Sequence, residues 1–177
     1  MPAMAMAASR SPIDDLMLAL ARVPEARSRF IETKSIAALS EPLTATGTLY
    51  YRRPSHLEKI TAPPHPEQLV VDGDQLALKE GDKAARVVDL GSQPRLRALV
   101  DAIRGTLSGD LALLQRWYRV EMTGSTAAWT LTLTPIDAGV ASLIKFIVIQ
   151  GSGASLRAMR TVQANGDDSR MTIDPLP

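Results

Sequence analysis

The strongest constraint on the fold is an alternation of apolar and polar residues with a period of two, interrupted once along the chain. Segments with this pattern are separated by turns rich in Pro, Gly, Asp and Asn, so each is typical of a short β-strand. These segments span 27–36, 44–53, 56–63, 67–73, 74–80 and 85–90, and then 117–124, 127–135, 142–150, 155–163 and 169–175. The sequence therefore predicts about eleven strands.

Helical periodicity occurs at the start of the chain and at the interruption. Ser11-Pro12 is typical of a helix start, and the helix should end before Pro24. A second helix is predicted for 94–107 and a short helical piece for 109–117. Apolar residues follow one face of each longer helix, namely Ile13, Leu16, Met17 and Leu20 in the first and Leu96, Leu99, Val100, Ile103 and Leu107 in the second.

The order of these elements favours an α+β fold. Strands grouped before and after a helical insertion indicate an antiparallel sheet with helices on one face. A twisted sheet of about ten or more strands must curl, so this one has an inside. The alternation predicts that the apolar inside is lined by Leu49, Tyr51, Leu76, Leu78, Trp129, Leu131, Leu133, Ile144, Phe146 and Val148. The helices either fill this inside as a dry core or cover a cavity.

Length, charge and composition narrow the functional classes. The 177 residues fit one domain, expected over 11–177, with residues 1–10 either the stub of an export signal or a disordered or vector-derived start. The net charge of +1 without a basic run argues against nucleic-acid binding. The absence of cysteine excludes disulfides and thiolate chemistry. No apolar run reaches the roughly 20 residues of a membrane helix.

Catalytic and metal-binding patterns are also missing from the sequence. His56 and His65 are the two histidines, and neither belongs to a cluster with the spacing of metal ligands. The Gly151-Ser152-Gly153 segment lacks the G-x-S-x-G spacing of a nucleophile loop and is interpreted as a turn. We expect no catalytic residues, no metal and no cofactor. A small hydrolase would need a nucleophile with a partner base, and none can be assembled.

The alternation places Arg53 beside the apolar set. It shares a face with Leu49 and Tyr51, while Arg52 points outward. Its stem could pack on the sheet with its head in water. Alternatively, its guanidinium could donate hydrogen bonds to carbonyls of a covering helix, or to the ester or phosphate end of an amphiphile.

The central part of the chain resembles the outer-membrane lipoprotein carrier protein family, LolA and LolA-like proteins. The segment 47–57, GTLYYRRPSHL, carries the G-x-L-x-x-x-R-P hallmark, and 66–76, PEQLVVDGDQL, carries the aliphatic residues and the D-G that follow it. The similarity extends over nearly the whole chain. This resemblance implies an unclosed, or half, β-barrel with amphipathic helices as a lid over an apolar cavity.

The resemblance also implies a function. Such proteins carry lipoproteins in the periplasm from an inner-membrane ABC-type exporter to an outer-membrane receptor. The family arginine that holds the lid matches Arg53, and the residue at the cavity mouth matches Leu57. Lys59 stands where an aromatic residue is common, so another lipid remains a possible cargo. We expect a monomeric carrier without enzymatic activity.

Two other classes stay open: a lipoprotein-sensing regulatory or protein-binding module on the same half-barrel, and an adhesion module with a dry core. For the carrier, Arg53 is the predicted lid latch. The predicted cavity residues are Leu49, Tyr51, Leu57, Leu76, Leu78, Leu96, Leu99, Ile103, Trp129, Leu131 and Phe146.

Overall fold

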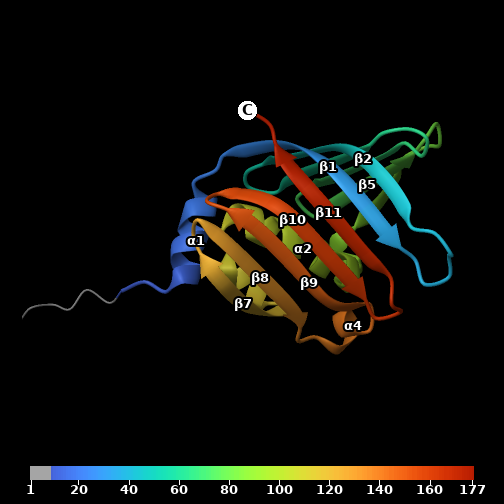
Figure 1. The fold of residues 1–177 in the computed structure, drawn as a ribbon. Helices are drawn as coiled ribbons and strands as arrows, with labels where there is room; N and C mark the ends of the chain where they lie inside the picture. Colours follow the sequence, from blue (N-terminus) through green and yellow to red (C-terminus); the bar gives the residue numbers. More distant parts are fainter. Residues whose placement is uncertain (1–8) are drawn as a thin grey trace, which may run out of the picture.

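The structure, a computed structural model, describes residues 9–177, so most of the interpretation of residues 1–10 lies outside it. Eleven antiparallel strands form one continuous sheet, as the alternation predicts (Figure 1). The strands are β1 (Glu25–Ser35), β2 (Leu43–Arg52), β3 (His56–Thr61), β4 (Glu67–Asp72), β5 (Gln75–Glu80), β6 (Arg86–Asp89), β7 (Tyr118–Ser125), β8 (Ala128–Pro135), β9 (Ile144–Ser152), β10 (Ser155–Gln163) and β11 (Asp168–Pro175). The helices are α1 (Pro12–Ala21), η1 (Leu90–Ser92), α2 (Pro94–Ser108), α3 (Leu111–Gln115) and α4 (Ala138–Ala141).

The first and last strands meet in the middle of the sheet. The spatial order is β6-β5-β4-β3-β2-β1-β11-β10-β9-β8-β7. Phe30 of β1 lies opposite Ile173 of β11, and this pairing joins two meanders into one sheet. The two edges of the sheet are therefore β6 and β7, which follow one another in the sequence but do not pair with each other.

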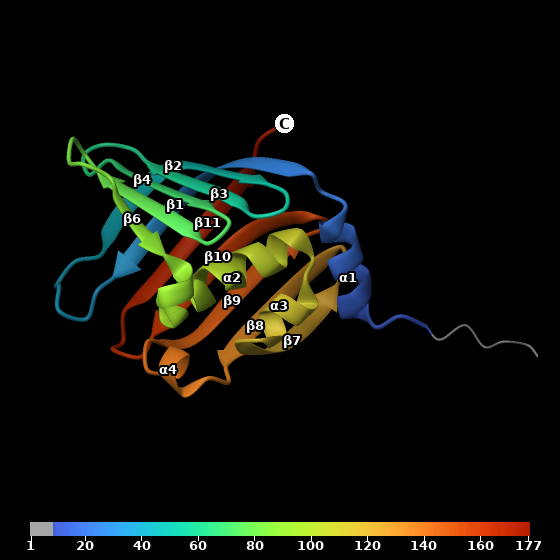
Figure 2. The same cartoon turned by 180° about the vertical axis from the view of Figure 1, so that it is seen from behind.

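The connection between these two edges places the helices. The chain leaves β6 through η1, α2 and α3 before it reaches β7. Because the sheet curls, α2 lies across its concave face (Figure 2). The predicted unclosed antiparallel sheet with helices on one face is confirmed.

Local sequence signals explain where the two longer helices begin and end. The Ser11 hydroxyl accepts a hydrogen bond from the Asp14 backbone N–H at 3.4 Å, and Pro12 opens α1. Gly109 ends α2 in the left-handed region at a φ of 66°. A β-carbon at Gly109 would lie 2.1 Å from the Met17 carbonyl oxygen, so this glycine also lets the end of α2 approach α1 closely.

The helix α4 was not predicted. It has four residues, which are too few to show a helical period, and the side chain of Asp137 caps it by accepting from the Val140 backbone N–H at 2.9 Å.

The predicted inward orientation of Phe146 and Val148 is wrong. The β9–β10 register shifts between Ile144 and Phe146, so the alternation changes phase within β9. Ile147 and Ile149 are buried on the concave face instead. Phe146 lies on the outer face, with the Arg160 guanidinium 5.6 Å from its ring centre.

Within residues 9–177, we find no helix that combines the length and the apolar character needed to cross a bilayer.

Gly47 of the central motif has a packing reason to be glycine. A β-carbon at this position would lie 1.9 Å from the Ile60 carbonyl oxygen and 2.8 Å from Cε1 of Phe30. Because Gly47 has no side chain, β3 can approach β2 and the Phe30 ring can lie over β2.

We expect Gly47→Ala to lower the free energy of unfolding by about 3 kcal/mol, because overpacking against a backbone oxygen cannot be relieved by a rotamer change. Urea unfolding measures this change. Thr48→Ala on the exposed face of the same strand is the control and should stay within about 0.5 kcal/mol of wild type. Equal effects of the two substitutions would contradict the packing argument.

Candidate functional site

The space between the helices and the concave face is occupied by two apolar clusters, one on each side of α2. The β2–β5 cluster consists of buried Tyr51, Leu57, Val71, Leu76, Leu90 and Val100, with half-buried Leu69, Leu78, Leu96, Ile103 and Leu107. The larger β7–β9 cluster consists of buried Leu16, Met17, Leu20, Ala98, Ala102, Leu114, Tyr118, Trp129, Leu131, Leu133, Val140, Ile144, Ile147 and Ile149, with half-buried Ile13, Leu99, Leu111, Trp117, Val120, Met122, Leu143, Leu156 and Met159. The helices rest directly on the sheet, since apolar faces on both sides are driven together.

Nine of the eleven predicted cavity residues are divided between these clusters. Six of them meet in the β2–β5 cluster, namely Tyr51, Leu57, Leu76, Leu78, Leu96 and Ile103. Leu99, Trp129 and Leu131 belong to the β7–β9 cluster, and Leu49 is half-buried beside Lys59 on the concave face. The sequence suggested one apolar face for α2, whereas the helix has two, because it is packed between the two halves of a curled sheet.

Arg53 holds the ends of two helices. Its Nη1 donates hydrogen bonds to the carbonyl oxygens of Ala21 at 2.6 Å and Ser108 at 3.2 Å, which are the last residues of α1 and α2. Neither helix has a basic residue in its last turn, so Arg53 supplies the positive charge that a helix C-terminus favours. The residue lies just after β2, is exposed, and is anchored through its backbone N–H to the Pro24 oxygen at 2.9 Å.

Buried charges fasten the middle of α2. Asp101 is fully buried and accepts from Nη2 of Arg104 at 2.8 Å and from Nε1 of Trp117 at 2.9 Å. Arg104 also donates to the carbonyl oxygen of Gly73 in the β4–β5 turn. Arg97 reaches Asp74 in the same turn at 3.2 Å. The D-G segment of the motif thus binds two arginines of α2. Sequence reasoning missed this role because these partners are far apart in the chain.

A polar group interrupts the concave face between the two clusters. The Lys59 ammonium lies 2.6 Å from Oε2 of Glu32, and the Ser169 hydroxyl donates to Oε1 of Glu32 at 2.7 Å. The Lys59 ammonium also lies 5.0 Å from the centre of the Phe30 ring. Alternation along 27–36 places Glu32 on the same face as Phe30, so the sequence held a signal for its position but not for its partners.

Glu32 is ionised at neutral pH. Burial by itself raises the pKa of this carboxyl, but the neighbouring Lys59, the Ser169 hydroxyl and Lys34 together outweigh burial and hold the pKa below its ordinary value of 4.5. The concave face therefore carries a charged pair where its neighbours are apolar.

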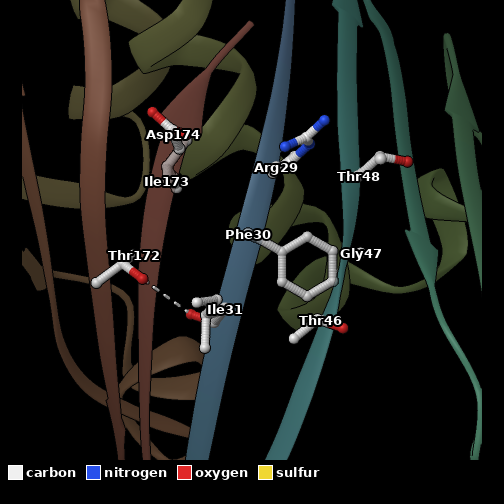
Figure 3. A pocket seen from close by; sticks show the side chains of 9 residues that line it. All are labelled: Arg29, Phe30, Ile31, Thr46, Gly47, Thr48, Thr172, Ile173 and Asp174. Atoms are coloured by element: carbon white, nitrogen blue, oxygen red, sulfur yellow. Dashed lines mark hydrogen bonds between the residues drawn. The ribbon is translucent and has the colours of Figure 1, made fainter.

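A hollow of about 460 Å³ lies over β1, β2 and β11 (Figure 3). Most of its lining residues alternate with the concave set and so belong to the outer face. They are Arg29, Ile31, Thr46, Thr48, Thr172 and Asp174, with Phe30, Gly47 and Ile173 between them. This hollow is not the cavity that the resemblance implies. Residues 9–177 contain no group of three or more His, Asp or Glu side chains placed to hold a metal ion.

Comparison with known proteins gave one family match. A family model described as outer membrane lipoprotein carrier protein LolA-like matches residues 5–174. No curated protein sequence matches the chain.

Several solved structures are similar at low sequence identity. A LolA superfamily protein from Nitrosomonas europaea is 11% identical, with a TM-score of 0.46 over 96% of each chain. The Mycobacterium tuberculosis lipoprotein LppX is 10% identical, with a TM-score of 0.46 over 93% of this chain and 95% of that one. A chain of the Pseudomonas aeruginosa MucA/MucB complex is 13% identical, with a TM-score of 0.47 over 92% of this chain and 56% of that one.

We expect Lys59→Met to lower the free energy of unfolding by about 3 kcal/mol, because it leaves the buried Glu32 carboxylate without its nearest cation. The double variant Glu32→Gln/Lys59→Met should recover most of this loss. Lys34→Met is the control, since its ammonium lies 3.8 Å from Glu32 and is half exposed, and it should change stability by less than about 1 kcal/mol. If the double variant is as unstable as the single one, Lys59 does not stabilise the protein by pairing with Glu32.

Proposed function

Because the chain belongs to the LolA-like family of outer membrane lipoprotein carrier proteins, we propose that it is a periplasmic carrier of lipid-modified cargo. It binds the acyl chains of a lipoprotein or another lipid and shuttles them from the inner to the outer membrane. An inner-membrane ABC-type exporter is the donor and an outer-membrane receptor the acceptor. Residues 11–177 act as one monomeric domain, and no chemical step is involved.

The observation that carries this proposal is the contact of Arg53 with the ends of α1 and α2. These hydrogen bonds are exposed, so water can replace them at little cost when the helices move. Movement of α2 away from the sheet would uncover the β2–β5 cluster. Arg53 is therefore a latch that favours the closed arrangement without making it permanent.

We place the acyl chain in the β2–β5 cluster. Its members Leu69, Leu78, Leu96, Ile103 and Leu107 are only partly buried. The β7–β9 cluster also has a partly buried periphery, but it has more than twice as many buried members, and α1, α3 and α4 are packed into it. Separation of α2 from the β2–β5 side disturbs fewer buried side chains, and the β7–β9 side supports the helix.

The energies suit a carrier that must also release its cargo. Each buried methylene of an acyl chain contributes about 0.8 kcal/mol, whereas a single hydrogen bond contributes about 1 kcal/mol net. Loading is opposed by the exposure of apolar surface on α2. It is also opposed by the loss of two hydrogen bonds, one from Arg53 to the end of α2 and one from Arg104 of α2 to the β4–β5 turn. Closure after release restores these contacts, and that gain assists release.

We expect protein purified from a Gram-negative periplasm to carry a stoichiometric lipid or acylated peptide in its organic extract, detected by mass spectrometry. A cytoplasmically expressed sample is the control and should lack this species. If both samples are empty and neither binds a fatty-acid probe, the carrier function is wrong and the protein-binding alternative takes its place.

We expect Arg53→Leu to bind lipid. The ratio of lipid transferred to acceptor membranes to lipid retained on the protein should be about fivefold lower than for wild type. The substitution removes hydrogen bonds of the closed, empty arrangement, so the loaded arrangement is relatively favoured. Transfer of a radiolabelled lipid to vesicles measures this effect. Arg52→Leu is the matched control, since Arg52 is exposed on the opposite face of β2. Unchanged transfer by Arg53→Leu would remove Arg53 from the release step.

A further inference from the structure

Tyr51 differs from the other tyrosines and from both tryptophans in its hydrogen bonding. Tyr50 donates to Glu25 at 3.0 Å, and Tyr118 donates to the Ala98 carbonyl oxygen at 2.8 Å. Both tryptophan N–H groups are likewise paired, with Asp101 and with the Gly153 carbonyl oxygen. The Tyr51 hydroxyl has no hydrogen-bond partner among residues 9–177, although Tyr51 is only 2% exposed.

An unpaired buried hydroxyl weakens the closed structure. Phenylalanine at this position would bury the same ring without leaving a polar group unsatisfied. The hydroxyl therefore contributes nothing to the stability of the arrangement seen here. A hydrogen bond from this hydroxyl can form only in the arrangement in which α2 is displaced from the sheet.

The surroundings of this hydroxyl define what it can bind. Tyr51 lies opposite Leu57 of β3 and belongs to the apolar β2–β5 cluster beneath α2. Burial raises the pKa of the Tyr51 hydroxyl, with the nearby positive charge of Arg53 acting in the opposite direction. The group is thus a neutral donor at physiological pH, at the end of an apolar surface and two residues from the latch.

We propose that the Tyr51 hydroxyl donates a hydrogen bond to the carbonyl oxygen of the acyl group of the cargo. This inference rests on the proposed function and names the part of the cargo that the site recognises. An acyl chain that enters the β2–β5 cluster brings its ester or amide carbonyl with it as the first group of the chain. That oxygen loses its water on entry and needs a donor, and Tyr51 provides one within the apolar surface.

The hydrogen bond also gives selectivity. A pocket with a donor for a carbonyl rejects an analogue that lacks it, because the donor is then left unpaired in the complex. An alkyl chain on an ether oxygen offers a weaker acceptor in the same place. The site should therefore prefer acyl lipids over alkyl lipids of the same length.

Two glycerol lipids that differ in this one group test the proposal. They are 1-dodecanoylglycerol, an ester, and 1-O-dodecylglycerol, an ether, used below their micelle-forming concentrations to displace 1-anilinonaphthalene-8-sulfonate from the protein. We expect wild type to bind the ester about fivefold more tightly than the ether, the factor that corresponds to one net hydrogen bond. Tyr51→Phe should bind both lipids with the affinity of the ether.

Tyr50→Phe is the matched control, since its hydroxyl bonds to exposed Glu25 on the outer face, and it should keep the preference for the ester. The melting temperature of Tyr51→Phe without lipid should equal or exceed that of wild type. A lower melting temperature would mean that the hydroxyl is paired in the closed protein, and it would overturn the proposal.

The remaining outcomes separate this inference from the carrier function. If wild type binds both lipids equally, or if Tyr51→Phe keeps the preference for the ester, Tyr51 does not recognise the carbonyl, although the protein still binds lipid. If wild type binds neither lipid, the proposed carrier function and the inference that rests on it both fail.

Discussion

The structure depends on a topological constraint: the chain must pass from one edge of the curled sheet to the other. Pairing of β1 with β11 puts the ends of the domain in the middle of the sheet and leaves β6 and β7 at its edges. The segment that joins them has to cross the concave face. Because α2 carries apolar residues on two faces, its crossing divides the interior into the β2–β5 and β7–β9 clusters.

Polar contacts control how firmly this crossing helix is held. Arg53 caps its C-terminal end in solvent, while Arg104 and Asp101 tie its middle to the β4–β5 turn and to Trp117. The first contact is exposed and weak, whereas the second is buried and costs more to separate. In the proposed carrier, this difference favours an opening that begins at the Arg53 end, where Tyr51 also lies.

In the proposed carrier, the two halves of the concave face have different roles. The β7–β9 cluster has the larger number of buried residues and holds α1, α3 and α4, which suits a fixed support. The β2–β5 cluster is smaller and contains an unpaired hydroxyl, which suits a surface that exchanges one apolar partner for another. The Glu32–Lys59 pair lies between them, and under the proposed function its charge discourages an acyl chain from extending across the middle of the sheet.

The sequence by itself determined the eleven strands and the ends of α1 and α2, because these features depend on local periodicity and capping. Only the tertiary structure decided which way Phe146 points, since a register shift in β9 reverses the alternation. It also decided that Lys59 meets Glu32 and that Asp101 meets Trp117, because cross-strand and helix–turn contacts join residues that no local pattern relates. The unpaired state of the Tyr51 hydroxyl belongs to this second group, since hydrogen-bond satisfaction is a property of the folded surroundings and not of the residue.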